Sequence, residues 1–289
     1  MIRIYSKSVV NRRQENQDRC SFMQLMTADG TSMWCVVVAD GMGGEQCGER
    51  YAELAIAEAM RFAADIVCSS GFQMIAKPAL TSERALLLQT ESAVKDMMNS
   101  INSAVCAKAE AQGILKGGST LSVCMICGDG MYYANAGDSP IYMLREARAT
   151  ELSIRDNNAE YMVRQHQMTR ESPEYEVESS ALRSFIGKRG DIETHSGHVR
   201  LRPGDIVVLG SDGAFGNTNC AEKLGALLAP VRSTSLICSH LFKSAAAETG
   251  DNQTAVVVEC YDGNQPGRAR TVERLVDRLL GEHTYDRSE

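Results

Sequence analysis

Five aspartates of this 289-residue chain stand directly beside short apolar runs, and their residue type suggests shared chemistry. They are Asp18, Asp40, Asp138, Asp212 and Asp251. Aspartate is a poor strand residue and is costly to bury, so carboxylates that meet at strand ends need cations to offset their repulsion. Ligand sets made only of oxygen favour hard ions such as Mg²⁺ or Mn²⁺ over zinc. The pattern therefore indicates a divalent-metal site, provided that the strand ends converge.

The same aspartates have a simpler interpretation as turn residues. The sequence contains five Asp-Gly pairs, and Asp-Gly is a strong signal for a tight hairpin turn. The pairs at 29–30, 129–130 and 262–263 are best explained as turns. For the pairs at 40–41 or 212–213 alone, a turn is about as well supported as a site. Only their combination with the remaining aspartates favours a site.

Two other patterns have the spacing of ligand pairs. Cys124 and Cys127 have redox or zinc spacing, but they lie in an apolar strand run, where residues three apart face opposite ways. We therefore predict two buried thiols. His195 and His198 have no nearby cysteine or third histidine to complete a site, so we predict a surface turn there.

The elements that must position the aspartates follow from hydrophobic periodicity. Apolar runs rich in Val, Ile, Tyr and Cys predict strands near 19–26, 33–39, 119–127, 131–136, 139–144, 205–210 and 253–260. Helical spacing predicts helices over 45–66, 83–111, 157–167, 219–229, 234–247 and 270–281. This order lacks the regular alternation of a doubly wound fold and favours antiparallel sheets covered by helices. The polar stretch 146–200 is predicted to be an irregular surface insertion.

The composition narrows the class of protein. The chain is 44% apolar and 23% charged, with a net charge of −7 and an isoelectric point near 5.4, which is typical of a globular protein and unlike a nucleic-acid binder. Ten scattered cysteines are best explained as free thiols in a reducing compartment. We find neither a signal-peptide pattern nor a membrane-spanning run, so we predict a cytoplasmic protein with no membrane partner.

Six short motifs, in order along the chain, resemble those of the metal-dependent type 2C (PPM) Ser/Thr protein phosphatases of the bacterial type. They are RQENQD at 13–18, VADGMGG at 38–44, GST at 118–120, NAGDS at 135–139, RPGD at 202–205 with GSDG at 210–213, and DNQT at 251–254. The resemblance implies an α+β four-layer sandwich, in which two central antiparallel β-sheets are flanked by helices on both faces. It implies a catalytic domain over 1–261, with a flap in the insertion 146–200, and leaves a short helical tail over 262–289.

The resemblance also assigns roles, carried over position by position. It implies two or three Mn²⁺ or Mg²⁺ ions: Asp40 bridges two of them with the Gly41 carbonyl as a further ligand, Asp212 and Asp251 complete one, and Asp138 joins Asp212 at a third. Asp18 holds a metal-bound water and Arg13 holds the substrate phosphate, so Arg13, Asp18 and Asp40 are the expected catalytic residues. These residue types suit attack on a phosphate monoester by metal-activated water.

The function implied is a phosphoserine/phosphothreonine phosphatase that acts in signalling on phosphorylated proteins, such as the targets of a Ser/Thr kinase. Two alternatives are a catalytically silent member that only binds phosphoproteins, and a phosphatase of small phosphoesters. Four positions depart from the family pattern: Gln17 replaces a common Glu, Met42 a His found in animal members, Pro140 a common Arg, and Asn157 a common His. Met42 leaves the general acid unassigned and fits a bacterial-type enzyme.

Overall fold

Two five-stranded antiparallel sheets form the centre of the molecule. The computed structural model describes residues 1–26, 30, 32–43, 47–68, 83–114, 116–216, 220–229, 231, 233–247 and 249–262, with the backbone alone at 68 and 83–93. The first sheet has the order β1 (Ile2–Val9), β12 (Gln253–Cys260), β11 (Ile206–Gly210), β8 (Ile141–Arg145) and β9 (Arg148–Glu151). The second has the order β10 (His195–Arg200), β7 (Gly130–Ala136), β6 (Leu121–Cys127), β3 (Ser32–Ala39) and β2 (Arg19–Met26). A short ribbon joins β4 (Gly41–Met42) to β5 (Gly118–Ser119).

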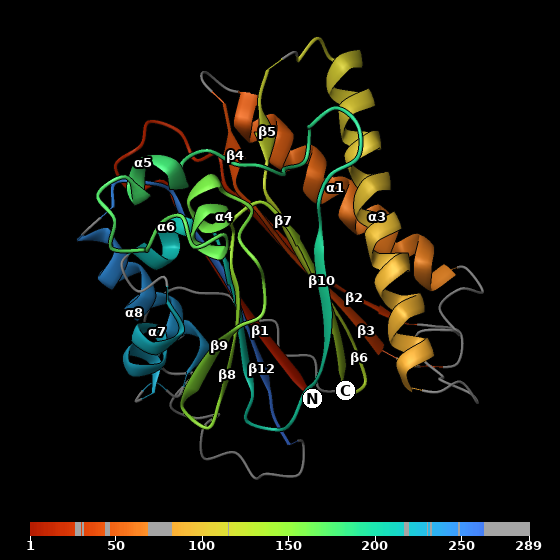
Figure 1. Ribbon diagram of the computed structural model, residues 1–289. Helices are drawn as coiled ribbons and strands as arrows, with labels where there is room; N and C mark the ends of the chain where they lie inside the picture. The colour runs from red at the N-terminus through yellow and green to blue at the C-terminus, as the bar shows by residue number, and fades with distance from the viewer. Residues whose placement is uncertain are drawn as a thin grey trace.

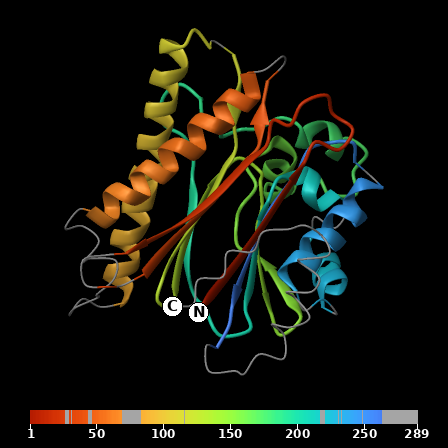
Figure 2. The same ribbon diagram turned by 180° about the vertical axis from the view of Figure 1, so that it is seen from behind.

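Helices cover the outer face of each sheet (Figure 1). The long helices α1 (Cys47–Cys68) and α3 (Glu83–Ala111) lie on the second sheet, and α7 (Ala221–Leu228) and α8 (Thr234–Ala246) lie on the first. Three short helices, α4 (Asn158–Arg164), α5 (Tyr175–Ser179) and α6 (Asp212–Phe215), lie near one end of the sheets. Figure 2 shows the same layers from behind. The predicted α+β four-layer sandwich is therefore confirmed.

The core has three parts, because each sheet buries both faces. One cluster lies between the two sheets and includes Val36, Ile126 and Val258, and the other two lie between each sheet and its helices. The central strands β3 and β12 are consequently apolar along most of their length, as is typical of strands that are covered on both sides. This rigid frame fixes where the chain emerges at the strand ends.

The predicted strands and helices that fall on described residues are present, with shifts of a few residues at their ends. In the two five-stranded sheets, three strands were not predicted: β1, β9 and β10. The stretch 146–200 is less irregular than predicted, because it contains β9, α5 and β10 in addition to the predicted helix α4. The predicted surface turn at His195 to His198 was wrong, since both histidines belong to β10. The predicted helix over 270–281 and the rest of the tail beyond Asp262 lie outside the described residues.

The described cysteines are buried or partly buried, and of the two predicted buried thiols Cys124 is buried whereas Cys127 is partly exposed. Cys124 faces the core between the sheets, whereas Cys127 packs on the opposite face of β6, as predicted. None of the nine cysteines whose side chains the structure describes forms a disulfide, and burial raises the pKa of Cys35 to about 12. Among the described helices, none combines the length and the apolar character that a membrane crossing requires.

Candidate active site

The segments that carry the five aspartates meet at one end of the sandwich because of the strand register. Strand β12 begins where β1 and β11 end, and β6 begins where β3 and β7 end. The segments near 10–18, 211–213 and 249–252 therefore adjoin in the first sheet, and those near 40–43 and 137–140 adjoin in the second. A backbone hydrogen bond of 3.2 Å, from the Gly41 N–H to the Gln17 carbonyl, joins the two groups. The convergence on which the metal-site prediction depends is thus present.

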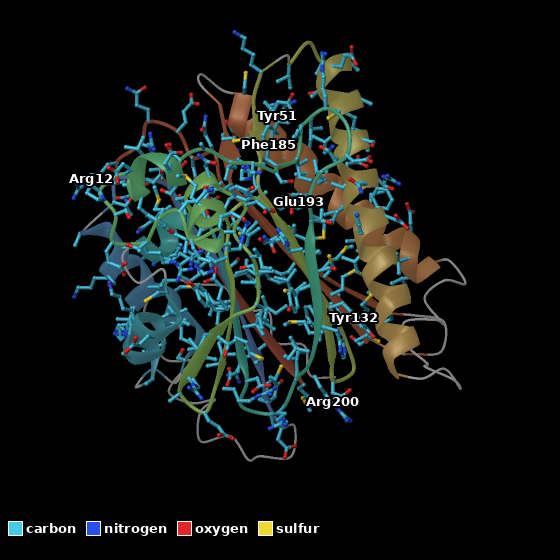
Figure 3. All side chains as sticks on the ribbon, viewed as in Figure 1. Arg12, Tyr51, Tyr132, Phe185, Glu193 and Arg200 are labelled. Atoms are coloured by element: carbon cyan, nitrogen blue, oxygen red, sulfur yellow. The ribbon has the colours of Figure 1, made fainter. Side chains whose placement is uncertain are left out.

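A groove of about 1000 Å³ opens at this end. Its lining includes six of the seven predicted site residues: Arg13, Asp40, Gly41, Asp138, Asp212 and Asp251. No cysteine is found among the described residues that line it, so thiol chemistry has no support there. Figure 3 labels Arg12, which also lines the groove, at this end of the molecule and Arg200 at the opposite end.

Asp18, the seventh predicted residue, lies beneath the groove rather than in its lining. The residue is only 2% exposed, and the Ser211 hydroxyl donates a 2.7 Å hydrogen bond to its Oδ2. Burial, reinforced by the charge of Asp212, raises the pKa of Asp18 to about 6 despite that hydrogen bond. A buried carboxylate of this kind can accept a proton near neutral pH.

Asp40 is held by its backbone at the end of β3. Its N–H donates to the Thr120 hydroxyl at 2.9 Å, and its carbonyl accepts from the Thr120 N–H at 2.8 Å. The next residue must be glycine, because a Cβ at Gly41 would lie 2.2 Å from the carbonyl oxygen of Gly48 in α1. Desolvation, followed by the charges of four neighbouring aspartates, raises the pKa of Asp40 well above its ordinary value.

Asp138 and Asp212 face the same groove from different sheets. Desolvation and the charge of Asp212 raise the pKa of Asp138 to about 7, although the Asn157 amide donates to its Oδ2 at 3.2 Å. Asp212 follows β11 and opens α6, and desolvation together with the charge of Asp251 raises its pKa. These shifts have one physical origin, which is an excess of negative charge in a poorly solvated place.

Arg13 and Asp251 form a two-pronged ion pair at the rim. The guanidinium Nε and Nη2 donate to the two carboxylate oxygens of Asp251, each at 2.8 Å. The Arg13 loop is fixed by Asn252, whose amide donates to the carbonyls of Val10 and Glu15, each at 2.9 Å. The predicted phosphate-binding arginine therefore reaches the groove, where it is paired with a predicted metal ligand.

Several residues that support the aspartates had no predicted role. They are Thr120, Ser211, Asn252 and Asn157, each of which bonds a site residue or the loop that carries one. Thr120, Ser211 and Asn252 lie inside the six motifs, and this position in the sequence could have indicated a supporting role. Asn157 was recognised only as a departure from the family pattern.

The donor set fits hard divalent ions. Four aspartates, Glu15 and the Gly41 backbone line one groove, and the described cations in its lining are Arg12 and Arg13, at its rim. Carboxylates and carbonyls are the ligands that Mg²⁺ and Mn²⁺ prefer. Desolvation, followed by the charges of neighbouring aspartates, raises the pKa values of Asp40, Asp138 and Asp212, and bound cations would oppose that rise.

Comparisons with known proteins identify the family and several relatives of this chain. Residues 7–249 match the family model described as protein phosphatase 2C. The chain is 28% identical over 231 residues to the serine/threonine protein phosphatase PstP of Mycobacterium tuberculosis, covering 78% of this chain but only 40% of that protein. It is 24% identical over 234 residues to the serine/threonine phosphatase stp of Listeria monocytogenes, covering 81% of this chain and 86% of the relative.

Solved structures share the fold. The serine/threonine phosphatase of S. agalactiae has a TM-score of 0.69 at 21% identity, covering 90% of this chain and all of that one. The catalytic domain of PstP, solved in complex with two manganese ions, has a TM-score of 0.65 at 24% identity. The match covers 90% of this chain and 99% of that one.

Proposed function

Because this chain belongs to the protein phosphatase 2C family, we propose that it is a Mn²⁺- or Mg²⁺-dependent protein phosphatase that hydrolyses phosphoserine and phosphothreonine. The observation that carries the proposal is the convergence of four aspartates, poor in cationic partners, on one groove. A catalytically silent member would be expected to have lost some of these carboxylates. All the positions assigned to ligands are present and face the groove.

The residues that would hold two ions are Asp40, the Gly41 carbonyl, Asp212 and Asp251, with Asp138 and Asp212 at a third. Their placement around the groove supports this assignment. When bound, such ions lower the pKa of water and stabilise negative charge on a phosphoryl group. The carboxylates of this chain would offset the charge of the ions and fix their positions. Asp18, which would orient the attacking water, is buried and accepts a hydrogen bond from Ser211.

Arg13 is the residue that would bind the substrate phosphate. Its two-pronged pairing with Asp251 supports this role, because a phosphate presents two oxygens to a guanidinium in a similar way. The substrate then replaces a carboxylate as the partner of Arg13. The guanidinium is largely exposed, with a side-chain exposure of 61%, so an incoming phosphoprotein can reach it.

The biological setting is a further part of the proposal. Substrates that are phosphorylated by a Ser/Thr kinase, a role in signalling and a cytoplasmic location all suit the family and the free thiols of the described chain. Nucleic acid and membrane remain unexpected partners for a chain of net charge −7. We also propose that residues 1–261 form the catalytic unit and that 262–289 are an addition to it.

The test is hydrolysis of p-nitrophenyl phosphate and of a phosphothreonine peptide by the full chain, with Mn²⁺ or with EDTA. Turnover of both substrates that depends on Mn²⁺ is expected. Absence of metal-dependent turnover on either substrate would reject the enzyme. Turnover of p-nitrophenyl phosphate alone would favour the small-phosphoester alternative. Asp129→Asn, a change at the far end of the sandwich, serves as the matched control and should behave like the unchanged protein.

A further inference from the structure

A second group of potential metal ligands lies where the 157–193 segment leaves and rejoins the sheets. Asp156 directly precedes α4, and Glu193 and His195 lead into β10. One ligand atom from each of the three side chains lies within 4.8 Å of the others. Figure 3 labels Glu193 where the chain enters β10, with Arg200 marking the other end of that strand. None of the three lines the groove.

Asp156 is buried with one carboxylate oxygen unsatisfied. The residue is 1% exposed, and its Oδ1 lies 2.7 Å from Nε2 of His195. Its Oδ2 is buried and has no hydrogen-bond partner. A buried carboxylate oxygen without a partner is costly, because it has lost its water without gaining a donor. A bound cation would remove that cost.

The backbone around the group holds the ligands in place. The Asp156 N–H donates to the Gly137 carbonyl at 3.0 Å, and the Asp156 carbonyl accepts from the Arg183 N–H. The Ser184 hydroxyl donates to the Glu193 carbonyl at 2.6 Å. His195 is paired with Asn135 of β7 in the sheet register. The ligands therefore come from two segments that backbone hydrogen bonds hold in place, and the exposed Glu193 leaves a route for an ion from solvent.

We propose that Asp156, Glu193 and His195 bind a divalent transition-metal ion, for which Zn²⁺ is the best fit. An imidazole beside two carboxylates suits zinc, whereas Mg²⁺ and Ca²⁺ prefer oxygen ligands throughout. A neutral imidazole binds metal through Nε2 with its proton on Nδ1, so the ion replaces the hydrogen bond between Nε2 and Asp156, and a proton on Nε2 moves to Nδ1 or is released to solvent. Water can fill the remaining coordination position.

A bound ion would hold together the two ends of the 157–193 segment, which borders the groove. Ser179, Ser180 and Leu182 of this segment line the groove, and Asn157, next to Asp156, bonds Asp138. An ion that joins Asp156 to Glu193 and His195 ties the two ends of the segment together. The site does not rest on the proposed phosphatase activity, and its occupancy can be measured without an assay of turnover.

The experiment uses the full chain with excess Mg²⁺ to occupy the groove, and titrates Zn²⁺ by calorimetry. A crystal treated in the same way is measured above and below the zinc absorption edge. In the crystal we expect an anomalous peak for zinc within bonding distance of His195 and the two carboxylates. In the calorimetric titration we expect His195→Ala to lose zinc affinity by ~100-fold or more. The matched control is His198→Ala, an exposed histidine of the same strand, which should keep the affinity.

Glu193→Gln provides a second variant, because an exposed side chain tolerates substitution. It should also weaken zinc binding. Zinc should slow proteolysis within 157–193 in the unchanged protein but not in His195→Ala. Zinc uptake that is equal in the unchanged protein, His195→Ala and Glu193→Gln would overturn the proposal. So would a crystal in which zinc scatters only in the groove.

Discussion

Both ends of the sandwich carry carboxylates, but the two ends differ in how those carboxylates are paired. At the end away from the groove, arginines pair with them: Arg145 grips Asp205 with contacts of 2.8 and 2.6 Å, and Arg200 contacts Asp129 at 2.6 Å. At the groove end, four aspartates share the nearby Arg13, which bonds one of them. The comparison shows that charge balance, rather than residue type, separates structural carboxylates from those available to a metal.

The same contrast explains why the sequence alone did not separate turn aspartates from site aspartates in Asp-Gly pairs. Asp129-Gly130 lies between two apolar runs, and Asp212-Gly213, the same dipeptide, follows one. The first lies at the β6–β7 turn and its carboxylate pairs with an exposed arginine. The second opens α6 in the groove, where a Cβ at Gly213 would lie 2.1 Å from the Asn252 carbonyl oxygen. Only the fold shows which carboxylate lacks a cation.

The largest expected effect comes from removing a carboxylate at the groove end. Asp40→Asn should lower kcat/KM by at least ~10³-fold, because metal ions supply several kcal/mol of stabilisation to phosphoryl chemistry and this side chain is their proposed bridge. Asp129→Asn should leave kcat/KM within twofold. The measurement is steady-state hydrolysis of a phosphothreonine peptide in saturating Mn²⁺. Similar losses in both variants would abolish the distinction between the two ends.

The next effect should appear at the opposite end, in stability rather than in activity. The Asp205 side chain is 2% exposed and also accepts the Arg202 N–H at 2.7 Å. Asp205→Asn should lower the free energy of unfolding by roughly 3 kcal/mol, since it leaves Arg145 without its buried partner. Asp129→Asn should change it by less than about 1 kcal/mol, because that pair is exposed. Urea denaturation compares the two variants, and equal stability losses would contradict the burial argument.

A pH effect should mark the buried carboxylate below the groove. The folded-state pKa of Asp18 is raised to about 6, so its contribution to stability is present below about pH 4 and is lost as pH rises through 6. Asparagine stays neutral and can still accept from Ser211. In EDTA, Asp18→Asn should therefore gain stability relative to the unchanged protein between pH 4 and pH 7, by up to about 3 kcal/mol. Thermal scans at pH 4 and pH 7 measure the stability difference between Asp18→Asn and the unchanged protein. A stability difference that is the same at both pH values would contradict a raised pKa of Asp18.

The smallest expected effect concerns the arginine at the rim. Arg13→Lys keeps the charge but loses the two-pronged geometry, so kcat/KM should fall by ~10-fold, mainly through KM. Arg145→Lys, the matched change at the other end, should leave both constants unchanged and lower stability instead. Kinetics on the phosphopeptide, together with a thermal scan of each variant, separates the two outcomes. An unchanged KM in Arg13→Lys would remove Arg13 from the phosphate site.

The sequence predicted the central strands, their covering helices and a set of candidate site residues, six of which line the groove, because central strands and motif aspartates carry strong local signals. It missed β1, β9 and β10, which are edge strands, and β9 and β10 contain few apolar residues. Prediction from apolar runs fails for such strands, since part of their surface faces water. It also missed the contact between Asp156 and His195, which are 39 residues apart in the chain. Pairings of that kind depend on the register of β10 with β7 and leave no local pattern.

The assignment of the groove as the metal site is tested most directly by manganese anomalous diffraction from crystals of the full chain grown with Mn²⁺. We expect manganese at the groove end, within bonding distance of Asp40, Asp212 and Asp251. We expect no manganese beside Asp129, Asp205 or Glu259, whose carboxylates already have arginine partners. Protein that hydrolyses phosphopeptide in Mn²⁺ but shows no manganese at the groove would contradict the central claim.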